Sequence, residues 1–580
     1  MKKQEKKFVL AALALLAITG LLALASCKND TVPEPTRYTV KFDKNAEDAS
    51  GEMQSQIFTE GVEQELSVNQ FKRATYTFSG WSEDKAATAP TYKDKAKFKA
   101  TKDTTLYAVW TDNGTVDPVT FSLPDGTKFY FGESIEVSLE TTTDGAIIQY
   151  KRDDGEWMDY TEETPISVTT STTITARATK DGLKPSAETT ATYTVRKLDF
   201  ISVTPPERTV YSVGQSFDPT GMVVTATYND NSQREVTGWE TDFSTVADVK
   251  GLNKPVTVSY TEGETPKTTT FTVTVFPAEV KVLTGYTSPN NTDDSWTYVE
   301  FGEWPQTIKA DSVTVGENEG KQMGMFTYYL GEDSNYYVKH SDKYYKVEPI
   351  VWRVLTEDYK DPDGKSTGNA LLLAESILTG GVPYYDVYNV DRTGVATIRP
   401  NNYEHSAVRA WLNGLEYQYK KDADTDQTTE KKYLDVGFLQ TAFTESARNL
   451  IADTSVDNSA ASTFGTGEST QENPYAYGKT KDKIFLLSQQ EATNSEYGFG
   501  AYSESGKGNT RIRVTTDYAE ATGAYQDSTG GYGGRWWLRS PYFFDKFDAR
   551  FINILGYASI NGEVNLTKGG VVPALSISLQ

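Results

Sequence analysis

The sequence predicts a multidomain, mainly β protein that ends in a larger α+β domain. Its length of 580 residues is more than one hydrophobic core supports, so we expect about four domains. In the first half, apolar and polar residues alternate over short runs that turn residues separate, as in β-strands. From Ala278 onwards this alternation gives way to mixed strand and helix patterns. The β modules therefore come first and the mixed domain last.

Composition excludes several classes of function. The chain has 80 acidic and 57 basic residues and a net charge of −23, so we expect no nucleic-acid partner, since phosphate binding needs a basic face. A single cysteine excludes a disulfide framework and a Cys-cluster metal site. The two histidines, His340 and His405, lack the spacing of a zinc hydrolase. We expect no metal, no cofactor and no catalytic residue.

The N-terminus predicts a targeting segment. Lysines precede an uncharged run from Phe8 to Ser26, and residues 1–26 are expected to be a signal peptide. The run ends in Leu-Ala-Ser-Cys at 24–27, which resembles the bacterial lipobox and implies that Cys27 is acylated. Residues 27–36 then form a tether, and the expected location is the bacterial cell envelope, at the surface, with the membrane as partner through the N-terminal lipid. An ordinary signal peptide that happens to end near a cysteine is the alternative.

Residues 37–111, the first module, show strand alternation at 38–42, 76–81 and 106–110. The Y-x-F-x-G-W and Y-A-x-W motifs in these runs resemble the Listeria–Bacteroides repeat, also called the internalin B-type repeat, which implies a β-grasp-like fold. Trp81 and Trp110 are expected in the core of this small module. A sugar-stacking platform is the alternative for these two rings.

Residues 117–196, the second module, resemble the chitobiase/β-hexosaminidase C-terminal-like module through the strands at 147–150 and 173–178 and the turn between them. The resemblance implies an accessory β-sandwich. Trp157 and Tyr160 either pack in its hairpin or stack on a ligand. Residues 197–277, the third module, resemble a bacterial Ig-like domain over the run from Tyr211 to Tyr228, which implies a second sandwich. We expect all three modules to act as spacers.

Residues 278–580, the C-terminal domain, contain one clear amphipathic helix. It begins after a Ser406 cap and places Val408, Trp411 and Leu412 on one face. The apolar runs at 350–355, 370–374 and 484–487 predict strands. The polar stretches 416–432 and 453–480 predict long surface loops.

Six motifs occur in order along the C-terminal domain: V-E-F-G-x-x-P from 299, I-V-W-R-V-L from 350, S-x-x-R-x-W-L-N from 406, F-L-L-S from 485, W-W-L-R-S-P from 536 and G-V-V-P-A-L from 570. Together they resemble an uncharacterised domain of bacterial envelope proteins that is related to the C-type-lectin-like fold of the formylglycine-generating-enzyme superfamily. The resemblance implies a scaffold whose irregular loops form a binding face. The paired active-site cysteines of the superfamily's oxidase are missing, so its chemistry does not carry over. Some relatives are diversified at the C-terminus by retroelements.

A window near the C-terminus is dense in aromatic residues, which binding loops favour because rings bury much area at low entropic cost. Its pattern fits neither a regular strand nor an amphipathic helix, so we expect some rings to face solvent. The candidate ligand-binding residues are Trp536, Tyr542, Phe543, Phe544, Phe547, Phe551, Asn553, Leu555, Tyr557, Ser559 and Asn561. The alternative is that these rings form ordinary β-rich core.

The resulting hypothesis is a lipid-anchored surface protein that displays a lectin-like, adhesin-type C-terminal domain, which binds a protein or glycan ligand. Diversification of this domain by a retroelement is part of the hypothesis. An envelope glycan-processing enzyme or its accessory subunit is the alternative, with Asp545 and Asp548 as conceivable acid and base. A purely structural envelope protein is the third hypothesis. Arg539 and Arg550 are expected to brace loops through bidentate carboxylate bonds. The acidic run 422–426 lacks the glycine and glutamate of an EF-hand.

Overall fold

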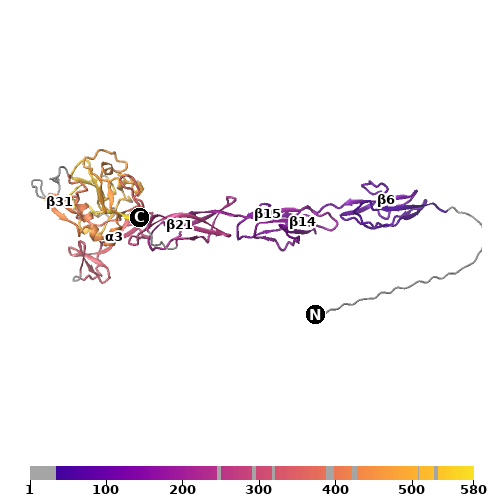
Figure 1. Cartoon of the computed structure of the whole chain (residues 1–580), viewed down its shortest axis with the longest axis horizontal. Helices are drawn as coiled ribbons and strands as arrows, with labels where there is room; N and C mark the ends of the chain where they lie inside the picture. The colour runs from indigo at the N-terminus through magenta and orange to yellow at the C-terminus, as the bar shows by residue number, and fades with distance from the viewer. Residues whose placement is uncertain are drawn as a thin grey trace, which may run out of the picture. The chain divides into compact units, whose positions relative to one another are not determined.

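The computed structural model describes residues 34–243, 250–290, 295–316, 320–386, 398–420, 428–506, 509–527, 533–558 and 560–579. The prediction of a multidomain, mainly β protein is confirmed. The chain divides into two compact units, Met1–Arg196 and Lys197–Gln580, and each is described by itself (Figure 1). No helix within these described ranges has the length and apolarity to cross a membrane. The predicted signal peptide and Cys27 lie outside the described residues.

The first module is built on a four-stranded sheet in the order β2-β1-β6-β4, in which β1 and β6 run parallel. Trp81 has no exposed surface and lies against Phe42, Phe71 and Phe78, so the expectation that it is core is confirmed. Gly80 is required before it, because a Cβ there would lie 2.3 Å from the carbonyl oxygen of Tyr92. The strands of this module are β1 (Arg37–Asp43), β2 (Gln56–Thr59), β3 (Gln64–Glu65), β4 (Tyr76–Ser82), β5 (Lys97–Phe98) and β6 (Thr104–Asp112).

The second module has a five-stranded sheet in the order β12-β11-β14-β15-β8 and two two-stranded sheets, β10-β7 and β13-β9, which together enclose one core. Trp157 is half-buried, with the Arg177 guanidinium 4.0 Å from its ring centroid, and Tyr160 packs on Tyr150, so both rings belong to the hairpin. The strands are β7 (Thr120–Phe121), β8 (Lys128–Phe129), β9 (Ile135–Val137), β10 (Leu139–Glu140), β11 (Ile147–Arg152), β12 (Met158–Asp159), β13 (Ile166–Val168), β14 (Thr172–Thr179) and β15 (Thr189–Val195).

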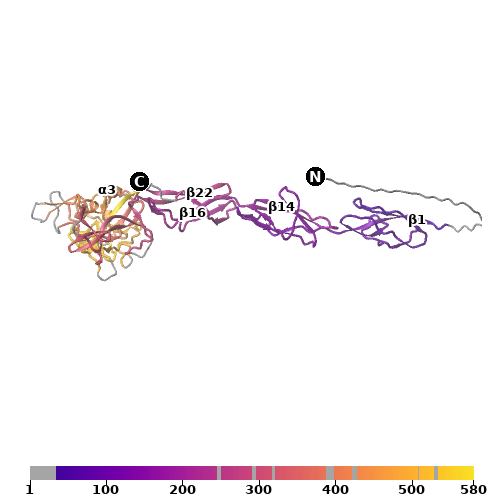
Figure 2. The ribbon, with the colours of Figure 1, turned by 90° about the horizontal axis from the view of Figure 1, so that it is seen from below.

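The third module, at the start of the second unit, is a two-sheet sandwich. One sheet has the order β16-β18-β19 and the other β17-β22-β21-β20, and β16 faces β22 across the core (Figure 2). Alternate residues of β22, Phe271, Val273 and Val275, are buried, as expected for a strand with one inner face. The strands are β16 (Leu198–Thr204), β17 (Val210–Ser212), β18 (Val223–Tyr228), β19 (Gln233–Glu235), β20 (Glu240–Thr241), β21 (Gly251–Glu262) and β22 (Thr265–Phe276).

The third module and the C-terminal domain share a hydrophobic core. Val210 and Phe276 belong to the same buried cluster as Val282 of the C-terminal domain. The Ser212 hydroxyl accepts a hydrogen bond from the backbone N–H of Val282 at 2.8 Å, and Gln215 Nε2 donates to the carbonyl of the same residue at 2.9 Å. The third module is therefore fused to the C-terminal domain. A spacer on a flexible linker would not share a core with its neighbour.

The C-terminal domain is organised by one large sheet with the path β25-β26-β27-β28-β29-β40-β35, while β24 pairs with both β28 and β23. The apolar runs that the sequence predicts as strands lie in β28, β29 and β35, and β29 is buried at Ala370 through Ala374. The inner strand β40 pairs with both β29 and β35. The strands are β23 (Lys281–Val282), β24 (Tyr298–Ile308), β25 (Lys321–Met323), β26 (Phe326–Leu330), β27 (Tyr336–His340), β28 (Lys343–Thr356), β29 (Asn369–Ala374), β35 (Ile484–Phe485) and β40 (Ala574–Ser578).

Short helices and small sheets surround this large sheet. The helices are α1 (Ala407–Asn413), α2 (Phe438–Ala442), α3 (Glu445–Leu450) and α4 (Asp517–Ala521), with 3₁₀ turns η1 (Ala460–Thr463), η2 (Glu491–Thr493) and η3 (Ser495–Tyr497). The small sheets pair β30 (Ser376–Ile377) with β36 (Val514–Thr515), β31 (Glu416–Lys420) with β32 (Thr428–Lys432), and β33 (Thr454–Val456) with β34 (Thr480–Asp482). The strands β37 (Trp536–Pro541), β38 (Asp548–Ile552) and β39 (Ile560–Glu563) form a three-stranded sheet in this order.

The predicted helix is confirmed as α1. The Ser406 hydroxyl accepts from the N–H of Arg409 at 3.1 Å, which caps the first turn, and Gly414 ends the helix in a left-handed conformation. Val408, Trp411 and Leu412 are buried, as the periodicity predicts.

The two polar stretches are not long surface loops, and that prediction is wrong. The described ends of 416–432 form the hairpin β31–β32. In 453–480, Asn458 and Asn473 are buried, and their side-chain amides donate to the Gly478 and Pro541 carbonyls, respectively, at 3.1 Å each. Polar composition misleads here because buried amides that are hydrogen-bonded inside the fold carry little penalty.

A fully buried ion pair links β28 to the segment after β29. Glu375 accepts from Arg353 Nη2 at 2.6 Å and from Arg353 Nε at 3.0 Å, and Arg513 Nη2 lies 3.8 Å from the same carboxylate. Burial alone would raise the pKa of Glu375, but the two guanidinium groups outweigh it and hold this pKa below its ordinary value. Burial and the neighbouring Arg353 lower the pKa of Arg513 to about 10.

Replacing Glu375 by glutamine is expected to destabilise the C-terminal domain by about 3–5 kcal/mol at pH 7, because it leaves two buried guanidinium groups uncompensated. Since the folded pKa lies below the ordinary value of 4.5, the carboxylate's contribution is present above that pH and disappears as the pH falls through the folded value. The difference in the free energy of unfolding between the natural chain and Glu375→Gln should therefore shrink as the pH falls below 4.5 in urea titrations. Glu404→Gln, at an exposed position, is the control, and a pH-independent difference for Glu375→Gln would contradict the assignment.

Candidate functional site

The strands β37 and β38 position the predicted binding window. They pair antiparallel with Trp536 opposite Ile552 and Trp537 opposite Phe551, and every residue of β37 is buried. Trp536 has no exposed surface, its Nε1 donates to the Arg511 carbonyl at 3.1 Å, and Phe551 is 7% exposed. The expectation that these two rings face a ligand is wrong, because all of β37 and residues 549–552 of β38 are buried.

The segment 542–547 that connects β37 to β38, called here the aromatic loop, is held by one buried side chain. Asn401 Nδ2 donates to the carbonyls of Asp545 and Asp548 at 3.1 Å each and approaches that of Tyr542 at 3.5 Å. The backbone N–H of Asn401 also donates to the carbonyl of Lys546 at 3.2 Å. Asn401 has no exposed surface, so these bonds are shielded from water. The loop is irregular in backbone, and Asn401 fixes its path at these carbonyls.

Three consecutive rings form the outer part of the aromatic loop. The Phe543 and Phe544 centroids are 3.8 Å apart, and Tyr542 lies 5.4 Å and 5.6 Å from them. Phe543 rests on the buried Phe464 at 5.5 Å, whereas Phe544 is 69% exposed, the largest exposure among the large hydrophobic residues of the described ranges. A phenyl ring in water on an otherwise packed loop is the feature expected of a contact residue.

A buried cation, Arg550, contacts two of these rings. The Arg550 guanidinium lies 4.8 Å from the Tyr542 ring centroid and 5.6 Å from that of Phe543, which are cation–π distances. Arg550 pairs with Glu468 at 3.0 Å, and Glu468 in turn accepts from Gln489 Nε2 at 2.9 Å. Arg539 likewise pairs with Glu491. Both arginines therefore pair with a carboxylate, Arg550 with Glu468 and Arg539 with Glu491.

The other predicted ligand residues divide by location. Phe547 is half-buried, and Lys546 Nζ lies 4.7 Å from its ring centroid. Asn553 forms a turn, because its Oδ1 accepts from the N–H groups of Leu555 at 2.9 Å and Tyr557 at 3.0 Å. Leu555 and Tyr557 are half-buried, and Tyr557 packs on Tyr502 at 6.3 Å. Asn561 is exposed and donates to Asp548, and Ser559 lies outside the described residues. The structure thus concentrates the exposed aromatic surface at 542–544.

Sequence reasoning missed Asn401, Phe464 and Glu468. Asn401 lies 144 positions before Asp545, and no local pattern connects the two. Phe464 and Glu468 lie in the stretch expected to be a surface loop, so they were not considered as support for the rings. Only the tertiary fold brings these residues together.

The geometry does not support Asp545 and Asp548 as the acid and base of an enzyme. Asp545 accepts the N–H of Phe547 at 2.9 Å, which is a turn-forming role. Burial raises the pKa of Asp548, opposed by the hydrogen bond from Asn561 and assisted by the nearby Asp545 and Glu563. Neither aspartate lines the cavity of about 590 Å³ in this domain, whose carboxylates are Glu279, Glu300 and Glu303.

Three family models match parts of the chain. Residues 38–109 match the Listeria–Bacteroides repeat domain, residues 204–275 the bacterial Ig-like domain (group 3), and residues 367–579 a domain of unknown function (DUF6273). The resemblances of the first and third modules to these families are therefore confirmed. None of the three descriptions names a catalytic activity. The Listeria–Bacteroides repeat and the bacterial Ig-like domain are consistent with a bacterial surface protein.

Two solved structures share partial likeness with the chain. The S-layer protein rSbsC is 15% identical with a TM-score of 0.16, over 59% of this chain and 52% of that one, so the chain spans about half its length. Invasin, a bacterial integrin-binding protein, is 12% identical with a TM-score of 0.15, over 79% of this chain and 100% of that one. At such low TM-scores these likenesses do not establish a shared fold. No curated protein matches the chain.

Proposed function

We propose that this chain is a lipid-anchored bacterial surface protein whose C-terminal domain binds a protein or glycan ligand through Tyr542, Phe543 and Phe544. The observation that carries the proposal is the exposure of Phe544, 69%, on a loop that Asn401 holds through the carbonyls of Asp545, Lys546 and Asp548. Fixing the loop before binding reduces the entropy lost on association. The resemblance of the domain to the C-type-lectin-like fold, in which irregular loops form the binding face, supports the same location.

In the proposed domain order, the lipid is at the N-terminal end of the sequence and the binding domain is at the C-terminal end. Residues 1–26 are the signal peptide, Cys27 carries the lipid, residues 27–36 are the tether, and the modules 37–111, 117–196 and 197–277 precede the domain 278–580. Each buried methylene of an acyl chain contributes about 0.8 kcal/mol, so two or three chains hold the protein firmly at the membrane. The chitobiase-like character of the second module belongs to this proposal as well.

The full chain in detergent is tested for binding on arrays of glycans and of extracellular proteins. Phe544→Ala is expected to reduce each specific binding signal by roughly tenfold or more, because truncating a central aromatic contact costs about 2 kcal/mol. Phe200→Ala, which removes a 50% exposed ring from the third module, is the matched control and should keep the signals. Thermal unfolding separates binding from folding, since Phe544→Ala should leave the transition nearly unchanged whereas the buried Phe551→Ala should cost about 3–5 kcal/mol. Undiminished signals from Phe544→Ala would reject the proposed loop.

Cys27→Ser is expected to abolish metabolic incorporation of an alkyne fatty acid and to move the protein from the membrane pellet to the supernatant, because no lipid then anchors it. Asn29→Ala, two positions away, should behave like the natural chain. If the serine variant stays in the membrane pellet, the anchor is elsewhere and this part of the proposal is wrong.

A further inference from the structure

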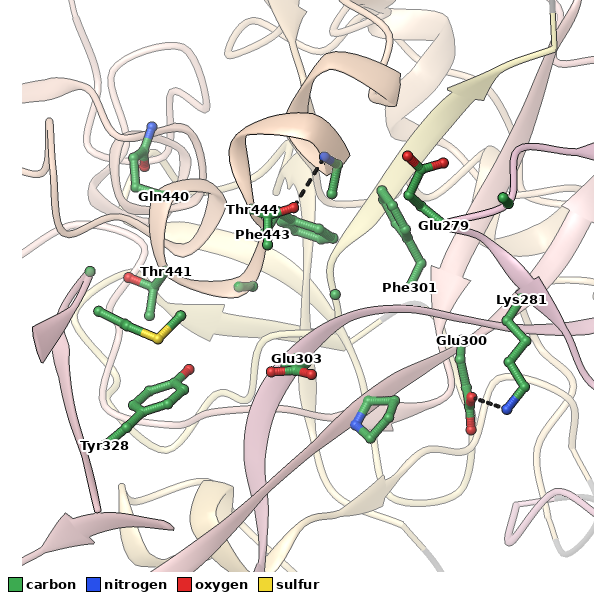
Figure 3. A pocket seen from close by; sticks show the side chains of 17 residues that line it. Glu279, Lys281, Glu300, Phe301, Glu303, Tyr328, Gln440, Thr441, Phe443 and Thr444 are labelled. Atoms are coloured by element: carbon green, nitrogen blue, oxygen red, sulfur yellow. Dashed lines mark hydrogen bonds and ion pairs between the residues drawn. The ribbon is translucent and has the colours of Figure 1, made fainter. Parts of the chain in front are cut away.

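A second candidate site lies in the C-terminal domain, where β24 passes the end of α2. A cavity of about 590 Å³ opens there, between β24, the segment 323–328 and residues 440–447 (Figure 3). Two glycines allow the neighbouring segments to lie close to the walls of the cavity. A Cβ at Gly302, which has φ +73°, would lie 2.5 Å from a Phe443 ring carbon, and one at Gly324 would lie 2.3 Å from the Thr441 hydroxyl. Any side chain at either glycine would clash with a wall of the cavity.

A β-bulge explains the unusual lining. The pairing of β24 with β28 shifts register between Glu300 and Glu303, so these two carboxylates, which a regular strand would direct to opposite faces, both line the cavity. Phe301 between them is only 2% exposed and packs on Phe443 at 5.0 Å. The bulge therefore combines an aromatic floor with acidic edges.

The walls are aromatic and apolar. Phe301, Tyr328 and Phe443 contribute three rings, and Met323 lines the cavity beside them. Tyr328 is 2% exposed; burial and, after it, the nearby Glu303 raise its pKa to about 12. Figure 3 shows the Glu303 carboxylate between the Tyr328 ring and the Phe301 ring. Aromatic faces next to a carboxylate attract an organic cation.

The charge of the lining is one-sided. Glu279, Glu300 and Glu303 face a single lysine, Lys281, whose Nζ is 2.9 Å from Glu300. Within the ranges that the structure describes, neither Glu279 nor Glu303 takes part in an ion pair. No group of three His, Cys, Asp or Glu side chains among the described residues could hold a metal ion, so a compact inorganic cation is a poor occupant. The unbalanced carboxylates call for a cation that also has apolar surface.

We propose that this cavity binds the arginine or lysine side chain of a partner polypeptide, with its charged group at Glu303 and its methylenes along the apolar lining. The volume lies within the roughly 300–1,000 Å³ of ordinary ligand sites and exceeds what a single small ammonium ion needs. The exposed Glu279 and Pro349 at the edge leave the cavity accessible to a chain that lies on the surface. The net charge of −23 would also speed the encounter with a basic partner. This site is separate from the aromatic loop and does not depend on it.

The test titrates the full chain in detergent with the peptide acetyl-Gly-Arg-Gly-amide, observed by calorimetry and saturation-transfer NMR. We expect millimolar binding that weakens roughly fivefold or more when citrulline, a neutral group of the same shape, replaces arginine, and by a similar factor in Glu303→Gln. Glu332→Gln, another exposed glutamate of the same domain, and Phe544→Ala should both bind like the natural chain. The Phe544→Ala arm separates this site from the proposed function.

Three results would overturn the assignment. The first is no binding of the arginine peptide, and the second is equal binding of the citrulline peptide or of Glu303→Gln. The third is tighter binding of tetramethylammonium than of the arginine peptide, which would assign the cavity to a free small cation. Because Glu303 is exposed, its replacement by glutamine should leave the fold intact, and an unchanged thermal transition verifies this.

Discussion

The hydrogen bonds from Asn401 to the aromatic loop are the constraint on which the proposed recognition surface depends. A loop of this kind has carbonyls that no strand partner satisfies, and an unpaired buried carbonyl costs about 1–3 kcal/mol. One amide group donates to the carbonyls of Asp545 and Asp548, which also accept the N–H groups of Asp548 at 3.4 Å and Tyr542 at 3.0 Å, and so it fixes the loop path. The exposure of Phe544 then follows from a defined backbone, and the ring stays out of the core because Phe543 already occupies the position against Phe464.

The same solution recurs through the C-terminal domain. Arg511 is fully buried and donates to the carbonyls of Gly556 at 2.6 Å, Ala501 at 3.0 Å and Glu504 at 2.8 Å, which ties two irregular segments together. Burial lowers the pKa of Arg511 to about 10, so it stays protonated at neutral pH. Arg539 donates to the Asp457 carbonyl from Nε at 3.1 Å and from Nη2 at 3.0 Å. Buried guanidinium and amide donors thus replace the regular ladders that a larger sheet would provide.

Local patterns were sufficient for the regular elements. The alternation in β1, β4 and β6 and the Ser406 cap of α1 are encoded within a few residues, so the sequence predicted them. Burial of Trp536 and Phe551 was not predictable in this way, because it depends on cross-strand pairing and on the covering of both sheet faces. The polar stretch around Asn458 was misinterpreted for a related reason, since the partners that make its burial tolerable lie far along the chain. The aromatic cavity at Glu303 depends on a bulge that composition does not reveal.

Hydrogen exchange in Asn401→Ala tests most directly whether one buried amide holds the aromatic loop in place. The N–H of Tyr542, which donates to Asp548 at 3.0 Å, and that of Phe547 should exchange about tenfold faster or more, since each lost hydrogen bond is worth roughly 1–1.5 kcal/mol. The N–H of Val571, bonded to Thr379 at 3.0 Å on another element, should keep its rate. Unchanged rates at Tyr542 and Phe547 would show that the loop does not need Asn401, and the account of a pre-formed aromatic surface would be wrong.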